Sequence, residues 1–509
     1  MSAGGKPSAR QLLQEGLARA RQGDIGGASA LLDRAVALDP RDAAVRTGRA
    51  ILYRVEGRLR DAVLACDEAI RLQPDLAGAW LERGVILAGG GSPELARQSF
   101  ARAAELAPRH ADAHANVAAL AARQGALEDA RTAAQQALSL EPDNILAAVA
   151  MGTVLLAERQ PEAVVSLLDP IVATAPLGDS RAQAHTLIGK AHEAQGRHAE
   201  AFASFTRAKA DFTAYTADIR RGRLPNSSFI TAIHQGFLAV DQSRWTSPEQ
   251  SGENRPNHVF LLGYPRSGTT LVENILASID GVAALEERPT LIETDRAFLM
   301  DEQADVADSL DRFASLDASG LAPLRDAYWD KVHSAGVPRD IVHFVDMDPL
   351  KGSRLPFIAR LFPEACIVIM RRDPRDVVWS CFRTDFAVTN ATLEYTSLEG
   401  VARHYDALMR LTQDALERLP LAFHELRYEA LVGDFEDTTR ALCDFAGLPW
   451  SESVHRFAQT ADQRGVATAS AGQVRRGLYD GSGQWKPYPE FFEPVLPILA
   501  PWIERFGYA

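Results

Sequence analysis

Along the first 210 residues, apolar positions recur at helical spacing, and the pattern repeats every 34 residues. Prolines mark this period, because five of them stand 34 residues apart: Pro40, Pro74, Pro108, Pro142 and Pro176. Small residues such as Ala62 and Ala69 recur between them and let two helices approach closely. Proline cannot continue a helix, so each one is expected to end the second helix of a unit.

The third unit shows the pattern most fully, with Trp80, Gly84 and Phe100 at characteristic places. The period and these positions resemble the tetratricopeptide repeat (TPR). They predict a curved helical solenoid of about six units over residues 1–210, with the fifth degenerate and the sixth in phase at Gly189 and Phe205. Two roles stay open: a structural or dimerising extension that could form a homodimer, or a concave surface that captures a peptide substrate or partner.

The next 45 residues, 211–255, are predicted to connect two domains. Phe229 to Val240 has helical spacing, whereas Ser243 to Pro256 is polar and rich in turn formers. The domain boundary is therefore placed before residue 256.

Residues 256–509 alternate between strand-like and helix-like patterns. Short apolar runs predict buried parallel strands, and stretches of helical period separate them. The predicted strands are Ile341–Val345, Cys366–Met370 and Leu419–Phe423, and the predicted helices include Leu355–Leu361 and Gly400–Arg418. Such alternation predicts an α/β domain with a parallel sheet and with ligands at the carboxyl ends of its strands.

The most informative stretch of this half is His258 to Thr270, reading HVFLLGYPRSGTT. An apolar strand is followed by a turn through Gly263 and Gly268, and a helical pattern begins at Thr269. This layout can cradle a phosphate with backbone N–H groups and a helix N-terminus. It resembles a nucleotide-binding P-loop, but Thr269 stands in place of the lysine that reaches the outer phosphates. A plain strand-to-helix turn is the alternative.

Composition narrows the class of protein and of partner. The 509 residues carry a net charge of −13, which argues against general binding to nucleic acid or to anionic membranes. No signal-like N-terminus and no apolar run of 18 residues is present. The four cysteines lack metal-binding spacing and are expected to be reduced. Together these features predict a cytoplasmic protein.

A second cluster of basic residues follows the strand predicted at Cys366–Met370. Arg372 and Ser380 stand eight residues apart across the start of a predicted helix. A guanidinium grips phosphate with two parallel hydrogen bonds, and a hydroxyl can donate another. A salt-bridge cluster at the strand end is the alternative.

The string PRSGTT, Pro265 to Thr270, resembles the 5′-phosphosulfate loop of sulfotransferases, which use 3′-phosphoadenosine 5′-phosphosulfate (PAPS). The resemblance covers about 256–490 and is nearest to the tyrosylprotein branch and to bacterial TPR sulfotransferases. It implies a P-loop-like sulfotransferase fold. It also implies that the 3′-phosphate is held by Arg372 and Ser380, and the phosphosulfate by Arg266, Ser267, Gly268, Thr269 and Thr270.

The same resemblance supplies a general base and exposes one departure. Glu287 stands 21 residues after Arg266, as does the base of the tyrosylprotein branch. An attacking hydroxyl must lose its proton, which a positioned carboxylate can accept. The family's lysine before the next helix is replaced by Met347. Either Lys351 or Arg354 is expected to restore the charge, and Lys351 is the candidate catalytic residue.

The remaining candidates are expected to line or to close over the cofactor. Tyr428 lies in a segment like the family's Tyr-Glu-x-Leu. A lid excludes water from the donor. Its candidate residues are Ser470, in the block Thr468-Ala469-Ser470, with Arg475, Trp485 and Lys486.

These expectations combine into a PAPS-dependent sulfotransferase that modifies a hydroxyl, favoured to be a peptide or protein tyrosine, without a metal. A glycan, lipid or small-molecule hydroxyl stays open as acceptor. Two other functions are kept beside it. One is a TPR scaffold with a catalytically weak nucleotide-binding module, which Met347 favours. The other is a magnesium-dependent P-loop enzyme, which Thr269 argues against.

Overall fold

The computed structural model describes residues 7–246, 256–301, 304–464, 470–475 and 477–509. Its contacts divide the chain into two compact units, Met1–Asp211 and Phe212–Ala509. Residues 247–255, where the sequence predicts a linker, lie outside the described ranges.

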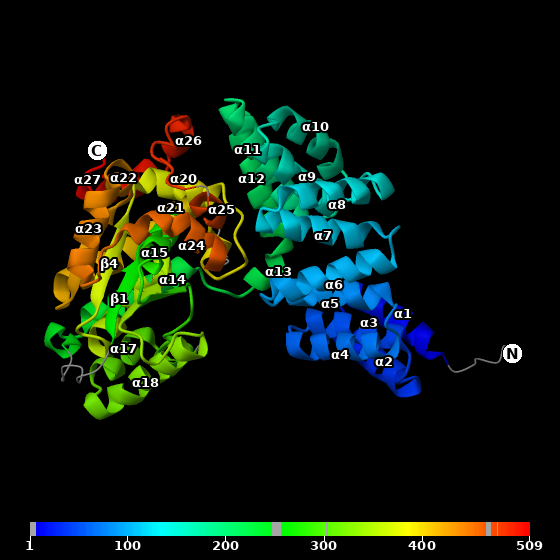
Figure 1. Ribbon diagram of the computed structural model, residues 1–509. Helices are drawn as coiled ribbons and strands as arrows, with labels where there is room; N and C mark the ends of the chain where they lie inside the picture. Colours follow the sequence, from blue (N-terminus) through cyan, green and yellow to red (C-terminus); the bar gives the residue numbers. More distant parts are fainter. Residues whose placement is uncertain (1–6, 247–255, 302–303, 465–469, 476) are drawn as a thin grey trace. The chain divides into compact units, whose positions relative to one another are not determined.

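The first unit is a helical solenoid of six consecutive helix pairs, which confirms the predicted architecture (Figure 1). Each pair packs on the next, and the predicted prolines follow the second helices. The pairs are α1 (Ala9–Arg21) with α2 (Ile25–Leu38), α3 (Ala43–Val55) with α4 (Leu59–Leu72), α5 (Ala77–Gly89) with α6 (Pro93–Leu106), α7 (Ala111–Gln124) with α8 (Leu127–Leu140), α9 (Ile145–Ala157) with α10 (Pro161–Val172), and α11 (Asp179–Ala194) with α12 (His198–Tyr215).

Glycine in the first helix of a pair makes room for an aromatic ring in the second. A Cβ atom on Gly84 would lie 2.4 Å from the ring of Phe100, and one on Gly189 would lie 2.6 Å from Phe205. Both rings are buried. The glycine and the phenylalanine have the same spacing in both units because they contact each other across the helix pair.

A recurring hydrogen bond fastens the turn between successive pairs. In three units, a side-chain N–H donates to the proline carbonyl six residues earlier. The bonds join Arg46 to Pro40 (3.1 Å), Trp80 to Pro74 (2.9 Å) and His114 to Pro108 (3.0 Å). A hydrogen bond of this kind contributes about 1 kcal/mol to stability. Arginine, tryptophan and histidine all have a side-chain N–H, so different residue types can fill the same position.

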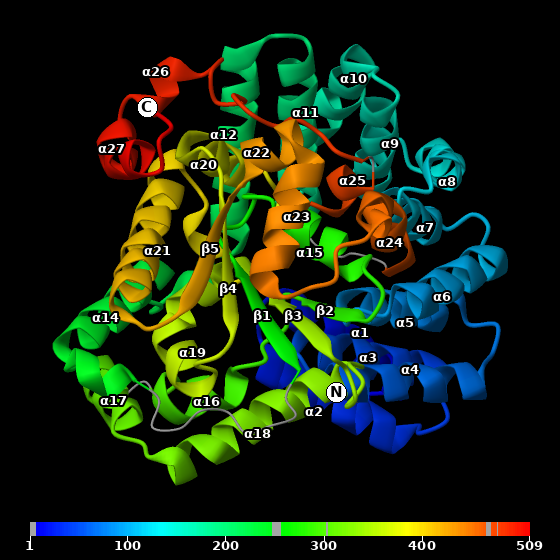
Figure 2. The same ribbon diagram turned by 60° about the vertical axis from the view of Figure 1, so that its left-hand side comes forward.

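The second unit is built on a parallel five-stranded sheet in the order β2-β3-β1-β4-β5 (Figure 2). The α/β prediction is therefore confirmed. The strands are β1 (Asn257–Leu262), β2 (Val282–Glu286), β3 (His343–Met347), β4 (Cys366–Arg371) and β5 (Ala422–Arg427). The central strand β1 lies between β3 and β4, so connections leave it in both directions.

Helices cover both faces of this sheet. One face packs against α15 (Thr269–Ala277), α22 (Tyr428–Gly433), α23 (Phe435–Ala446) and α24 (Phe457–Arg464). On the other face, the rings of Phe260 and Phe344 contact aromatic residues from α18 (Ala318–Ser334) and from the end of α19 (Leu355–Leu361). The first face is therefore covered by a mainly aliphatic core, and the second is lined by aromatic rings.

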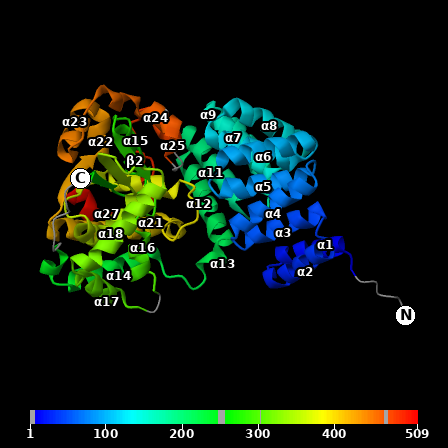
Figure 3. The ribbon, with the colours of Figure 1, turned by 60° about the horizontal axis from the view of Figure 1, so that its bottom comes forward.

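The connector helix α14 (Asn226–Ala239) belongs to this second unit. It packs on α17 (Val306–Ala314) and α21 (Leu398–Arg418), beside which it lies in Figure 3. Ile230, Ile233 and Phe237 are buried there. The predicted helix at Phe229–Val240 is thus confirmed, and it contributes to the core of the unit.

Two predicted strands differ from those observed, and one strand was missed. The run Leu419–Phe423 starts in the turn that follows α21, which ends at Arg418, and only its last two residues belong to β5, which begins at Ala422. β5 is an edge strand with mostly exposed residues, so its sequence is more polar than the buried strands. β3 starts two residues later than predicted. The opposite edge strand, β2, has too short an apolar run to stand out.

Candidate functional site

The candidate residues follow the carboxyl ends of the strands. Strand β1 leads into the loop from Gly263, β2 into Glu287, β3 into Asp348, β4 into Arg372 and β5 into Tyr428. All five strands are parallel and in register, so these ends meet at one edge of the sheet. This is the edge where open α/β sheets bind ligands.

The loop between β1 and α15 is tightly folded around its glycines. Gly268 has φ +110°, and a Cβ there would lie 2.9 Å from the ring of Tyr428. A Cβ on Gly263 would lie 2.8 Å from the hydroxyl of Ser267. Arg266 also has a positive φ of 73°, which is uncommon for a residue with a side chain. The loop backbone therefore packs closely against Ser267 and Tyr428 at its glycines, and it adopts a left-handed conformation at Arg266.

Arg266 joins the loop to two other segments. Its Nε donates to Ser380 (3.0 Å), and its two terminal nitrogens donate to Ser470 (2.5 Å) and to Gln473 (2.7 Å). Burial lowers its pKa to about 10, and the neighbouring cation Arg372 acts in the same direction. Arg266 still carries its charge at neutral pH.

Arg372 lies beside Arg266 and is 7% exposed. It donates to the carbonyl oxygens of Arg266 (2.9 Å) and Gly481 (2.5 Å), and it stacks over Tyr428 with its carbon 4.7 Å from the ring centre. Its buried Nε has no hydrogen-bond partner within the described part of the chain. A buried donor without a partner is costly, so this side chain suits an anionic ligand.

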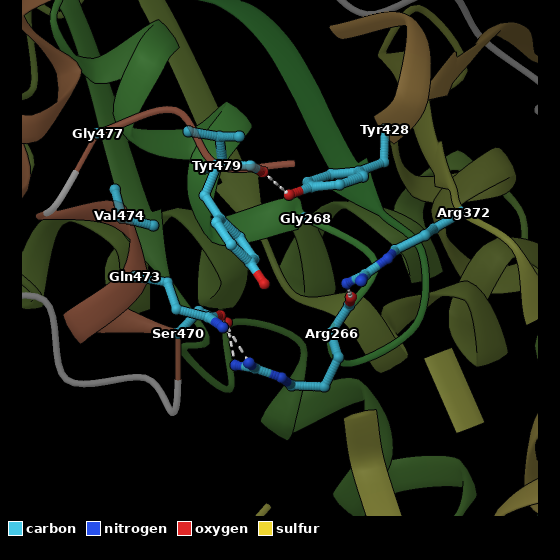
Figure 4. A pocket seen from close by; sticks show the side chains of 10 residues that line it. Arg266, Gly268, Arg372, Tyr428, Ser470, Gln473, Val474, Gly477 and Tyr479 are labelled. Carbon is cyan, nitrogen blue, oxygen red and sulfur yellow. Dashed lines mark hydrogen bonds between the residues drawn. The ribbon is translucent and has the colours of Figure 1, made fainter. Parts of the chain in front are cut away.

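These groups surround a pocket of about 430 Å³, a volume that includes solvent at its mouth (Figure 4). Its two cations face an apolar wall and a tyrosine ring. The lining consists of Arg266, Gly268, Leu271, Arg372, Tyr428, Ser470, Gln473, Val474, Gly477 and Tyr479. The hydroxyl of Tyr428 donates to the carbonyl of Tyr479. The pocket thus combines anion-binding and ring-binding surfaces.

Gln473 and Tyr479 were not predicted from the sequence. Both lie on the segment that approaches the loop from more than 200 residues away. Neither belongs to a periodic pattern, so the sequence contains no local signal for them. Gln473 lies within the segment assigned to a lid, and that assignment was the only available indication.

Other candidates lie around the pocket without lining it. Ser267 is buried and its hydroxyl accepts from the N–H of Tyr264 (3.3 Å), while Thr269 and Thr270 are buried in the first turn of α15. Ser380 contacts the pocket through Arg266.

The predicted closing residues are dispersed. Arg475 lies 3.6 Å from Asp462, and Trp485 stacks on Arg375 at 4.3 Å. Lys486 is exposed. None of the three lines the pocket, so among the four lid candidates the structure brings only Ser470 to it. Thr468 and Ala469 lie outside the described residues.

Glu287 occupies a constrained turn just after β2. Its φ is 46°, and its N–H donates to the carbonyl of Met347 (2.8 Å). The residue is exposed overall, while neighbouring protein atoms partly desolvate its carboxyl. This desolvation raises the pKa of Glu287 to about 7, and the charge of Asp348 acts in the same direction. A carboxyl with such a pKa is suited to accept a proton near neutral pH.

Neither cation expected to compensate for Met347 reaches the pocket. Lys351 donates to Asp346 (2.6 Å), and Arg354 forms two bonds to Asp295 (2.8 and 3.2 Å). Met347 itself is fully buried in the sheet core. The described cations that line the pocket are therefore Arg266 and Arg372.

No group of three or more histidine, cysteine, aspartate or glutamate side chains in the described ranges has a metal-binding arrangement. No helix built from the described residues is both long and apolar enough to cross a membrane. All four cysteines are free thiols.

Comparison with known families gives two matches. Residues 256–452 match the sulfotransferase family. The ranges 13–77, 68–108, 81–145 and 149–216 match the tetratricopeptide repeat. The two matches fall on the sheet-containing part and on the solenoid.

Three curated relatives illustrate the similarity. An uncharacterized protein of Aquifex aeolicus is 29% identical over 249 residues, covering 47% of this chain and 32% of the relative. Protein-tyrosine sulfotransferase 1 of Danio rerio is 25% identical over 268 residues, covering 49% and 72%. Protein-tyrosine sulfotransferase A of Caenorhabditis elegans is 22% identical over 284 residues, covering 50% and 69%. The match thus spans about a third of the Aquifex relative.

Two solved structures resemble part of the chain. Pseudomonas aeruginosa pilF is 17% identical with a TM-score of 0.35, covering 41% of this chain and 97% of that one. PilW, a type IV pilus biogenesis factor, is 20% identical with a TM-score of 0.35, covering 40% and 93%.

Proposed function

The chain joins tetratricopeptide repeats to a sulfotransferase-family domain, and from this premise we propose that it transfers a sulfuryl group from PAPS to a hydroxyl acceptor. The observation that carries the proposal is the pairing of Arg266 and Arg372 around a pocket at the same sheet edge as Glu287. Two cations suit a donor with two anionic groups, the 3′-phosphate and the phosphosulfate, and a carboxyl with a raised pKa suits an acceptor hydroxyl.

The donor is proposed to bind in the pocket of Figure 4. Arg372, with its unpartnered Nε, is assigned to a phosphate. Arg266 and the N–H groups of the loop are assigned to the phosphosulfate, where negative charge develops on the leaving oxygen. Leu271, Val474 and Tyr479 offer the apolar and aromatic surface that a nucleobase needs.

On the acceptor side, Glu287 takes the hydroxyl proton as the new oxygen–sulfur bond forms and the sulfur–oxygen bond to the phosphate breaks. A tyrosine of a peptide or protein is the proposed acceptor, because two relatives are named protein-tyrosine sulfotransferases. The repeats are proposed to hold that peptide or a partner protein.

One observation favours a second candidate, a scaffold whose nucleotide-binding module is catalytically weak. Met347 is buried in the core, while Lys351 and Arg354 are both bound to carboxylates. The leaving group therefore depends on Arg266 and the loop, without a lysine.

Calorimetric titration with PAP, the desulfated donor, in EDTA tests the donor site. We expect binding to the full chain, weakened roughly 100-fold in Arg372→Ala, since charged hydrogen bonds contribute about 1.5–3 kcal/mol each. Arg375→Ala is the matched control. Arg375 follows the same strand, but it binds Asp373 and the carbonyl of Tyr508 outside the pocket.

Transfer from radiolabelled PAPS to tyrosine peptides, with phenylalanine versions as controls, then tests the reaction. Label on the tyrosine peptides alone supports the proposed enzyme. Binding of PAP without transfer to any hydroxyl supports the scaffold. Binding of magnesium-ATP in place of PAP contradicts both.

A further inference from the structure

We propose that Lys351 and Asp346 form a buried ion pair that positions the turn carrying Glu287. Lys351 thereby acts on the base rather than on the leaving group. This inference rests on the proposed function and assigns a positioning role to a residue for which the sequence predicted a catalytic one.

The pair lies in the interior of the second unit. The ammonium of Lys351 is 2.6 Å from Asp346 Oδ1, and the two side chains are 5% and 0% exposed. An isolated charge at either position would be strongly destabilising. Each residue therefore fixes the other, and Lys351 has little freedom to reach another group.

The turn after β2 is fastened at three points by this region. The N–H of Glu287 donates to Met347 O (2.8 Å), next to Asp346 in β3. Lys351 Nζ donates to the carbonyl of Arg288 (3.2 Å). The hydroxyl of Thr290 donates to Asp346 Oδ2 (2.8 Å). The pair therefore holds both the residue after Glu287 and the residue that ends the turn.

Glu287 needs this support because its backbone is strained. With φ at 46°, a side-chain-bearing residue is in the left-handed region, which persists only where its surroundings hold it. The hydrogen bond from the ammonium of Lys351 to the carbonyl of Arg288 holds the backbone one residue after Glu287. Loss of Lys351 is therefore expected to let Glu287 relax.

Asp346 is in turn anchored by the helix layer behind the sheet. Tyr328 of α18 donates its hydroxyl proton to Asp346 Oδ2 (2.7 Å). Its oxygen lies 2.8 Å from His258 Nε2, so that nitrogen is the donor in this bond. This series of hydrogen bonds connects β1 and α18 to the turn that carries Glu287. The buried core therefore fixes the position of that turn.

The geometry separates Lys351 from the donor pocket. The pocket is lined by Arg266 and Arg372, and Lys351 is absent from its lining. The hydrogen bonds of its ammonium go to Asp346 and to Arg288. A lysine in these contacts stabilises the turn on the acceptor side of the sheet edge.

Lys351 is also the cation that opposes the acids around Glu287. The acidic groups are Glu286 at the end of β2, Asp348 after β3 and Glu273 of α15, which is itself paired with Arg464 of α24 at 2.6 Å. Tyr395 also interacts with Glu287 from the loop before α21. The charge of Lys351 lowers the pKa of Glu287. Removing it takes away this opposing charge and raises the pKa of Glu287 further.

Two variants of the full chain test the proposal. Lys351→Met removes the cation and leaves Asp346 buried without it. The double variant Asp346→Asn/Lys351→Met removes both charges of the pair, so no unpaired charge is left at this position to destabilise the fold. Lys331→Met is the control, since it removes an exposed lysine paired with Glu293 (3.1 Å) in the same unit. We expect PAP affinity within twofold of the parent in all three. We also expect at least a tenfold loss of kcat in the first two only.

The decisive readout is the titration of Glu287, followed by carbon NMR of labelled glutamate and assigned by the signal lost in Glu287→Gln. It needs no transfer activity, so its result stands even if the sulfotransferase proposal fails. We expect the midpoint to rise in both Lys351 variants and to stay unchanged in Lys331→Met. An unchanged midpoint, with kcat lost, would place Lys351 at the leaving group and overturn the proposal. Full activity in the double variant would also overturn it.

Discussion

At the residue scale, the carboxyl of Glu287 has a pKa close to neutral pH, so the reaction rate should report its protonation. Its pKa of about 7 means that the base is mostly protonated below pH 6. The rate should therefore rise about tenfold per pH unit below this value and level off above it. A pH profile of kcat measures this rise on the acidic side.

Replacing the base tests the same assignment. Glu287→Gln should lower kcat by roughly 10²–10⁴ and abolish the acidic limb, while leaving PAP affinity unchanged. Glu293→Gln is the control, because Glu293 is bound to Arg296 and Lys331 away from the strand ends. Retention of full activity in Glu287→Gln would remove it as the base.

The loop glycine makes a second prediction at this scale. Gly268→Ala introduces a Cβ 2.9 Å from Tyr428 at a φ of +110°, so the loop or the tyrosine must shift. We expect PAP binding to weaken at least tenfold in calorimetry. Gly281→Ala shares a positive φ of +83° but meets nothing within 4 Å. It should lose some stability and keep its affinity, which separates backbone strain from the collapse of the cradle.

At the scale of the element, the solenoid depends on close contact within each helix pair. Gly84→Ala brings a Cβ to 2.4 Å from the buried ring of Phe100 and should destabilise the first unit by about 1–3 kcal/mol. Gly78→Ala in the same helix meets nothing within 4 Å and should stabilise the helix by up to about 1 kcal/mol. Urea unfolding of the full chain measures both. Equal midpoints for the two variants would contradict the contact argument.

The elements show which parts of the fold can be predicted from the sequence. The helices at Leu355–Leu361 and Gly400–Arg418 and the strand at Cys366–Met370 were located because each has an unbroken apolar pattern. The edge strands β2 and β5 were missed or displaced, since only one side of an edge strand is buried. Burial produces the pattern, so elements at the margin of the sheet have little of it.

The site divides in the same way. Arg266 and Arg372 could be proposed because Arg372 directly follows the apolar strand β4 and Arg266 lies in the loop that leaves the apolar strand β1, where a parallel sheet collects its ligands. Tyr479 and Gln473 could not, because their segment reaches the pocket only through tertiary packing. The partner of Lys351 was equally hidden, since Asp346 faces it only once β3 is in place.

At the scale of the whole molecule, the position of α14 predicts where the chain can be divided. Burial of Ile230, Ile233 and Phe237 contributes about 1.5–3 kcal/mol each. Their sum is comparable with the total stability of a domain. Further bonds join Asn226 to His404 (2.9 Å) and Ser227 to Glu394 (2.6 Å).

A fragment that begins at residue 212 should therefore fold and bind PAP, whereas one that begins at 256 should not. Circular dichroism and calorimetry of the two fragments check this. Folding and normal affinity of the shorter fragment would show that α14 is dispensable.

The reach of Arg266 across the chain has a consequence for synthesis on the ribosome. Its partner Ser470 lies 204 residues later, and the other walls of the pocket extend to Tyr479. A nascent chain that has produced the loop and even all five strands still lacks one side of the pocket. Nucleotide can then bind only to chains that extend past Tyr479, where binding adds to stability by mass action. Prematurely terminated chains gain no such protection and remain open to proteolysis.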